Sequence, residues 1–292
     1  MITPLGIDQV HAANGAIIVG ITIDRGSGTI GSNTPIPVTF GQVFRPGDVP
    51  AGRSISLETA SGQVIASQSN IKATYPDGSA KHAIISTLVP VASNSSKHLF
   101  LRDIPTSSNT PTFSITDILS SGYNTTVELT MSGTQAVYHA SVSEAYSLSG
   151  VKIQWLQGSI ANEWQVRMPF VSSTGVEHPH LMARFGVQAY SGGLIRSDVT
   201  IENAWTHEAN PQNFTYNVVM KDSLGTPRFS YNNLKHYSHA RFREVFWDKG
   251  MDPVSTIKHD TNYLIDTKVV PNYDRSIAID SAIIDLEYGY LQ

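Results

Sequence analysis

Cysteine is absent from the 292 residues, so disulfides and cysteine-ligated metals are excluded and stability must come from packing. Charged residues are scarce as well: they make up 15% of the chain, against about 25% in an average soluble domain. The net charge is −4, and lysine and arginine form no cluster. A nucleic-acid groove needs clustered cations, so we expect no nucleic-acid partner.

Long apolar runs are missing too. No stretch approaches the roughly 20 apolar residues of a membrane-spanning helix, so we expect no membrane contact. Residues 1–20 lack the charged and then continuously apolar pattern of a signal peptide, so we expect no Sec-dependent export. The chain has no P-loop and no G-x-S-x-G elbow, and nothing in it calls for a cofactor.

What is present is a series of short alternating or apolar runs separated by Gly, Pro, Asn and Ser, which predicts strands. These runs cover residues 16–23, 35–44, 54–60, 62–75, 82–91, 125–131, 136–142, 152–158, 163–170, 181–190, 194–205, 214–220 and 239–247. Only residues 259–270 predict a short helix, with Asp260 as its N-cap. Many strands at this spacing indicate an all-β protein built from barrels or sandwiches.

One segment, residues 102–122, is rich in Ser, Thr and Pro and favours a linker. We therefore expect a barrel-like β domain over residues 1–104, a linker over 105–122 and a larger β-sandwich-type domain over 123–292.

The stretch ATYPDGSAKHAIIS, residues 73–86, places an Asp, a Ser, a Lys and a His close together. Pro76, Asp77, Gly78 and Ser79 have the residue types of a tight turn between two strands. Strand alternation then sends the two basic side chains that follow, at 81 and 82, to opposite faces of the sheet. A structural hairpin is therefore favoured over a catalytic cluster.

Two groups of side chains are candidates for chemistry. His178 and His180 lie two residues apart, so in a strand they share a face and could chelate a metal, but no second dense cluster completes a ligand set. Hydrogen-bonded or surface histidines are the alternative, and no metal is predicted.

The second group is His236, Tyr237, His239, Arg241 and Arg243, which resembles the base and uronate-binding residues of a polysaccharide lyase. The same five residues are equally consistent with the polar outer face of one strand, so no catalytic residue is assigned. All four tryptophans, Trp155, Trp164, Trp205 and Trp247, lie in the second half. Core packing is the default for each, and stacking on sugars is the alternative.

Two stretches together resemble a known family. VTFGQVFRPGDVPAG (38–52) and KATYPDGSAKHAIIS (72–86) are similar to the N-terminal RIFT-barrel domain of the exo-rhamnogalacturonan-lyase-like proteins, also found in larger bacterial and phage proteins. Residues 158–170, 199–205 and 270–274 resemble such proteins more loosely. The residues that match fold-defining positions are Phe44, Gly47, Asp77, Gly78 and Ser79.

The resemblance implies a β-rich N-terminal region followed by a helical α/α-toroid catalytic domain. This sequence has no long helical run before its last residue, Gln292, so no catalytic residue can be carried over. Either the catalytic domain lies beyond this sequence, or the protein uses only the β modules.

Three functions follow from these features. The leading hypothesis is a virion structural protein, a phage tail, baseplate or fibre-attachment component, whose partners are other virion proteins and further copies of itself. The alternative is a polysaccharide lyase whose helical domain is missing. The third is a non-catalytic carbohydrate-binding module that contacts surface polysaccharide. We expect location in the virion, or else in the cytoplasm or outside the cell by a non-Sec route.

Overall fold

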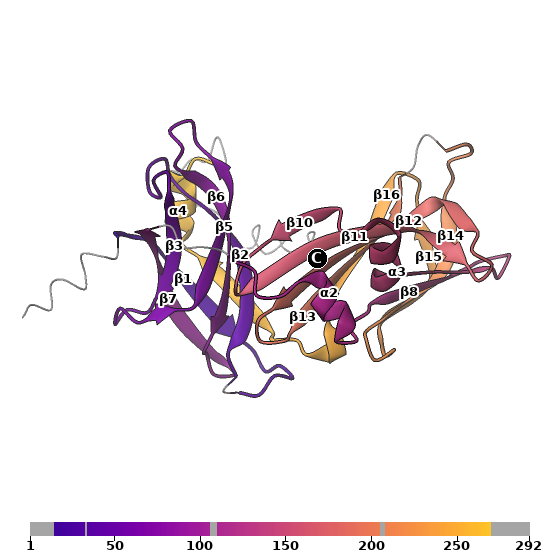
Figure 1. Cartoon of the computed structure of the whole chain (residues 1–292), viewed down its shortest axis with the longest axis horizontal. Helices are drawn as coiled ribbons and strands as arrows, with labels where there is room; N and C mark the ends of the chain where they lie inside the picture. Colours follow the sequence, from indigo (N-terminus) through magenta and orange to yellow (C-terminus); the bar gives the residue numbers. More distant parts are fainter. Residues whose placement is uncertain (1–14, 33, 106–109, 205–207, 270–292) are drawn as a thin grey trace, which may run out of the picture.

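The computed structural model describes residues 15–32, 34–105, 110–204 and 208–269 and shows a nearly all-β protein (Figure 1). The all-β prediction is confirmed. Two groups of strands surround two separate hydrophobic cores. None of the helices in the described ranges is long and apolar enough to cross a membrane. Residues 270–274, part of the looser family resemblance, lie outside the described residues.

The first domain is a barrel made of two sheets. A five-stranded sheet has the order β17-β1-β7-β3-β4 and a three-stranded sheet has the order β2-β6-β5. The strands are β1 (Ile17–Arg25), β2 (Ile36–Val43), β3 (Arg53–Glu58), β4 (Val64–Ile65), β5 (Ser67–Thr74), β6 (Ala80–Val89), β7 (Ser95–Pro105) and β17 (Ser255–His259). Alternation explains their packing, since Val19, Ile21 and Ile23, every second residue of β1, are buried in the barrel core.

The stretch at residues 73–86 contains a β-hairpin between β5 and β6. The Tyr75 N–H donates to the Ser79 carbonyl at 2.8 Å, and Gly78 adopts a φ of +82° that the turn requires. The Asp77 carboxylate accepts from the Ser79 hydroxyl at 2.6 Å and from its N–H at 2.9 Å. These bonds, the hydroxyl bond first, lower the pKa of Asp77. Lys81 is exposed, whereas His82 is half-buried on the other face of β6. The two side chains therefore do not form a catalytic pair.

The second domain is built on one nine-stranded sheet of order β15-β14-β8-β9-β11-β12-β13-β16, with β10 paired to β11. Its elements are α2 (Ile115–Ser120), β8 (Thr126–Met131), β9 (Val137–Ser141), α3 (Val142–Ser149), β10 (Ile153–Leu156), β11 (Ala161–Ser172), β12 (Glu177–Tyr190), β13 (Ile195–Asn203), β14 (Phe214–Lys221), β15 (Pro227–His236), β16 (Ala240–Trp247) and the 3-10 turn η1 (Asp248–Gly250). The sheet curls around a single core, and its two edge strands, β15 and β16, follow each other in the chain.

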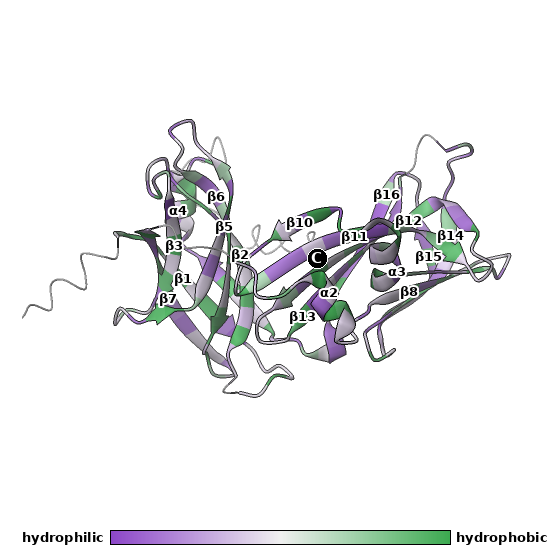
Figure 2. Cartoon of the chain, viewed as in Figure 1, coloured by the Kyte–Doolittle hydropathy of each residue, from purple (hydrophilic) through white to green (hydrophobic). Residues whose placement is uncertain are grey.

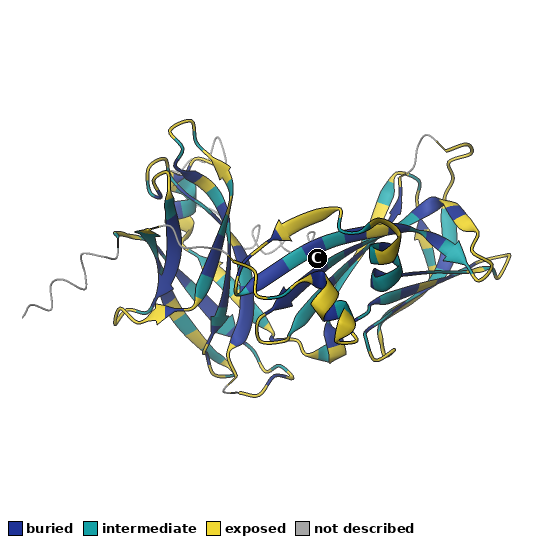
Figure 3. Cartoon of the chain, in the orientation of Figure 1, coloured by how far each residue is buried: buried dark blue, intermediate teal, exposed yellow. Residues whose placement is uncertain are grey.

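This curled sheet is nearly a closed barrel. The rings of Phe229 on β15 and Phe242 on β16 lie 5.5 Å apart between centroids and pack against the core where the sheet edges approach. The larger β domain expected from the sequence is therefore present, and both of its β layers belong to one sheet. Figures 2 and 3 show that hydrophobic and buried residues alternate along many strands with more polar and less buried ones, while the connecting loops are largely exposed.

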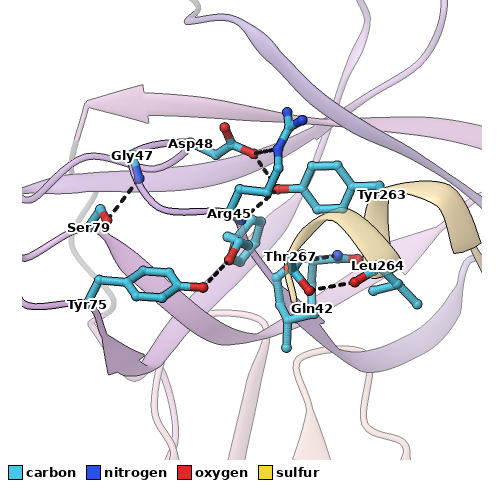
Figure 4. Close-up of polar contacts among 11 residues, drawn as sticks. Gln42, Arg45, Gly47, Asp48, Tyr75, Ser79, Tyr263, Leu264 and Thr267 are labelled. Carbon is cyan, nitrogen blue, oxygen red and sulfur yellow. Dashed lines mark hydrogen bonds and ion pairs between the residues drawn. The ribbon is translucent and has the colours of Figure 1, made fainter. Parts of the chain in front are cut away.

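The chain returns to the first domain near the end of the described residues. Strand β17 pairs antiparallel with β1, and helix α4 (Thr261–Asp266) follows it, capped by Asp260 as the sequence predicts. Tyr263 of α4 is buried in the barrel core, where its hydroxyl donates to Asp48 at 2.6 Å and its ring lies under the Arg45 guanidinium (Figure 4). The domain boundary expected at residue 123 places this segment in the second domain, whereas β17 and α4 pack on the first. The pairing of two strands about 230 residues apart cannot be predicted from local sequence pattern.

The predicted linker is also partly structured. Residues 115–120 form α2, whose N-terminus carries a reciprocal cap between Ser114 and Asp117. Ile115 and Ile118 are buried in the core of the second domain, so this end of the linker belongs to that domain. The Ser and Thr residues that suggested a linker include the cap itself.

Candidate functional site

A cleft of about 360 Å³ lies between the two domains. Strand β2 of the barrel forms one wall, with Val38, Thr39 and Phe40. The second domain forms the other wall, with Trp155, Glu163, Gln188, Tyr190, Arg196 and Trp247. The segment that leads into β17 closes one end through Asp252 and Pro253.

Four of these side chains form one row across the sheet. Glu163 on β11 pairs with Gln188 on β12, Gln188 pairs with Arg196 on β13, and Arg196 pairs with Trp247 on β16. Directly opposed residues of antiparallel strands have Cβ atoms about 5 Å apart and point to the same face. The row therefore faces away from the core, toward the cleft, and its members come from positions up to 84 residues apart in sequence.

Two members of the row, Glu163 and Arg196, carry charged side chains. Among the described residues, neither the Glu163 carboxylate nor the Arg196 guanidinium has a hydrogen bond or ion pair with another side chain. Burial raises the pKa of Glu163, an effect that the positive charges of Arg196 and Lys72 oppose. A partly buried carboxylate without a protein donor is a costly feature that a bound ligand with donor groups would relieve.

Aromatic rings border the row. Trp155, on β10, is 40% exposed, although core packing was its default expectation. Trp247 stacks on Tyr190, with centroids 5.9 Å apart and planes 27° apart. The Tyr190 hydroxyl hydrogen-bonds to the Thr39 hydroxyl at 2.7 Å and so ties the row to the barrel wall. Trp164 is a core residue, as expected, and Trp205 lies outside the described residues.

The five lyase-like residues do not converge on a common cleft. His236 is buried, bonded to the Tyr216 hydroxyl at 2.7 Å and to the Ala240 carbonyl at 3.0 Å, and burial lowers its pKa. Tyr237 is 61% exposed. His239 holds the turn into β16 at a φ of +64°, and its N–H donates to a carbonyl of β13.

Arg241 and Arg243 take the outer face of β16, as the alternation predicts. Arg241 forms an ion pair with Glu202 at 2.8 Å, and Arg243 forms one with Asp198. Because Asp198 lies on the same face of β13 as Arg196, both arginines sit on the polar surface that extends from the cleft. The lyase-like constellation thus separates into a buried histidine, an exposed tyrosine, a histidine in the turn before β16 and two paired arginines.

His178 and His180 do share a face, with ring centroids 6.3 Å apart. Nδ1 of His178 accepts the backbone N–H groups of His180 and Leu181, at 3.2 and 3.1 Å. Burial lowers the pKa of His178 to about 4. Aromatic rings of Tyr138 and Phe214 pack on the pair, and the part of the chain that is described contains no group of three His, Asp or Glu side chains able to hold a metal.

A glycine pattern after β1, Gly26-x-Gly28-x-x-Gly31, has the spacing of a dinucleotide fingerprint. Such a fingerprint presents backbone N–H groups to a phosphate at the start of a helix. Here the loop leads into strand β2, and its carbonyls point inward to the buried Arg25, which donates to Ile30 and Gly31 at 2.9 Å each. The loop is a structural cage around Arg25, and it offers no phosphate cradle.

Residues 29–99 match the family model of the PcRGLX-like N-terminal RIFT barrel domain. The first domain is thus a RIFT barrel of the rhamnogalacturonan-lyase-like kind, which confirms the resemblance for that part of the chain. Its marker residues meet in the fold: the Gly47 N–H donates to the Ser79 hydroxyl at 3.0 Å, and the Tyr75 hydroxyl donates to the Phe44 carbonyl at 2.8 Å (Figure 4). No curated protein matches the chain.

Proposed function

Because the first domain is a RIFT barrel of the rhamnogalacturonan-lyase-like kind, we propose that the protein binds carbohydrate in the cleft between its two domains. The observation that carries this proposal is the row of Glu163, Gln188, Arg196 and Trp247, with Trp155 beside it. Charged and amide groups without protein partners, next to accessible aromatic rings, match the two chemistries of a sugar.

A sugar ring has an apolar face and a rim of hydroxyl groups. The face packs on an indole ring such as Trp155, because both surfaces then leave water. The rim offers donors to the Glu163 carboxylate and acceptors to the Arg196 guanidinium, and the Gln188 amide can do both. The half-buried setting strengthens these hydrogen bonds relative to bulk water.

Binding without cleavage is the form of this proposal that the geometry favours. A lyase needs a base within hydrogen-bond reach of the proton it abstracts. The candidate bases of the sequence, Tyr237 and His239, are not among the described residues that line the cleft. The cleft itself supplies recognition groups, and chemistry would have to come from a further domain.

A glycan array followed by calorimetric titration with a defined rhamnogalacturonan oligosaccharide tests the proposal. We expect measurable binding that Trp155→Ala and Trp247→Ala each weaken at least tenfold. Tyr231→Ala removes an exposed aromatic ring on β15 that is not among the residues lining the cleft, and it should leave binding unchanged. Absence of binding to any glycan, or equal binding by all three variants, contradicts the proposal.

We also propose a second role, as a structural component of a virion that presents this cleft. The observation in its favour is the direct coupling of the two domains: strand β17 pairs with β1 of the first domain, and Gln68 of β5 hydrogen-bonds to Ala161 of β11. A scaffold under mechanical load needs such coupling. Mass spectrometry of purified particles tests this role, and absence of the protein from the particles excludes it.

A further inference from the structure

Strand β5 of the barrel carries a row of three polar side chains aimed at the second domain. Gln68, Asn70 and Lys72 occupy alternate positions, so they lie on one face of the strand. Each one donates a hydrogen bond to a backbone carbonyl of the segment from Trp155 to Ala161, which joins β10 to β11. The contacts therefore run in register along both segments.

Gln68 makes the largest number of these contacts. Its amide N–H donates to the Ala161 carbonyl at 2.8 Å, and its amide oxygen accepts the N–H groups of Ile160 and Ala161 at 3.0 Å each. A Cβ on Gly158 would lie 2.2 Å from this amide, so the connecting segment approaches β5 as closely as glycine permits. Asn70 adds a bond to the Gln157 carbonyl at 2.9 Å.

Lys72 acts at the end of the row where the cleft begins. Its ammonium group donates to the Trp155 carbonyl and lies 4.1 Å from the centroid of the Trp155 ring. A cation this close to an indole face is attracted by the ring quadrupole. Partial burial lowers the pKa of Lys72, and the negative charge of Glu163 across the cleft opposes that shift. Lys72 covers one face of Trp155, so a ligand can stack only on the other.

We propose that Gln68, Asn70 and Lys72 are positioning residues that hold Trp155 as the stacking platform of the cleft. The inference rests on the proposed carbohydrate-binding function and adds a specific cause for its affinity. A tryptophan on an edge strand has several rotamers and would lose that freedom on binding a ligand. Lys72 of the barrel restricts the Trp155 rotamers before any ligand binds. The first domain thereby affects the affinity of a site whose polar row lies on the second domain.

The test measures Trp155 itself, with and without a ligand. The full chain is labelled with 5-fluorotryptophan, and the Trp155 fluorine signal is assigned with Trp155→Phe. Lys72→Met removes both contacts, Lys72→Arg retains a cation and donors, and Lys235→Met removes an exposed lysine of β15 as a matched control. Each variant is then titrated with the same rhamnogalacturonan oligosaccharide.

We expect the Trp155 signal to shift and broaden in Lys72→Met, and the dissociation constant to rise about tenfold, as loss of a partly buried cation–π contact implies. Lys72→Arg should restore both within about twofold, and Lys235→Met should match the unchanged protein. An unchanged Trp155 signal in Lys72→Met overturns the positioning role, whether or not the oligosaccharide binds. If the unchanged protein does not bind the oligosaccharide, only the proposed function fails, because the fluorine signal still decides the positioning role.

Discussion

Replacing Gln68 by alanine should weaken the junction of the two domains by a calculable amount. The Gln68 side chain is 2% exposed and satisfies three backbone groups of the second domain, the N–H groups of Ile160 and Ala161 and the carbonyl of Ala161. A buried group left without a partner costs about 1–3 kcal/mol. Water entering the vacated space relieves part of this cost, so the expected loss in the free energy of unfolding is about 2–4 kcal/mol.

Urea unfolding followed by circular dichroism measures this loss from the shift of the midpoint. Gln63→Ala is the matched control, because it truncates an exposed glutamine of the same barrel. Gln68→Glu tests the mechanism further: the carboxylate can still accept both N–H groups but cannot donate to the Ala161 carbonyl. We expect its stability to lie between those of Gln68→Ala and the unchanged protein. A Gln68→Ala midpoint equal to that of Gln63→Ala would refute the reasoning.

Three further outcomes are expected. Because the pKa of Glu163 is raised in the folded protein, its contribution to stability is complete below the ordinary carboxyl pKa and is lost as pH rises through the raised value. In urea unfolding, the stability of Glu163→Gln relative to the unchanged protein should therefore be higher at pH 7 than at pH 4.5, and the variant should bind carbohydrate more weakly. A variant less stable than the unchanged protein at pH 7 would be inconsistent with this cause. Gly78→Ala should lower the free energy of unfolding by about 1–2 kcal/mol, since its φ is +82°, whereas Gly192→Ala, with nothing within 4 Å of the added carbon, should be nearly neutral by thermal unfolding. Incubation with pectic polysaccharide should give no unsaturated-sugar absorbance; product formation that disappears in Tyr237→Phe and His239→Ala would establish the lyase alternative instead.

Local sequence pattern predicts much of the fold. Pro76, Asp77 and Gly78 predict the hairpin because a turn is specified by the residues within it. Alternation likewise predicts that Phe242 faces inward while Arg243 faces outward. The all-β class follows from the same short-range signals.

The candidate site could not be predicted in the same way. Glu163, Gln188, Arg196 and Trp247 become neighbours only through the register of four strands, and no local signal specifies which residues of distant strands oppose each other. The sequence pointed instead to a dense local cluster around Tyr237. Alternation within β15 and the turn at His239 place the side chains of this cluster on different faces of the sheet.

The central claim is that the cleft between the domains binds carbohydrate, and the indole N–H signals of the four tryptophans test it most directly. They are assigned by single substitution and followed by NMR during titration with a rhamnogalacturonan oligosaccharide. We predict saturable shifts for Trp155 and Trp247, which line the cleft, and none for Trp164, which is buried in the second core. Titration that leaves Trp155 and Trp247 unmoved, or that moves only Trp164, would contradict the account.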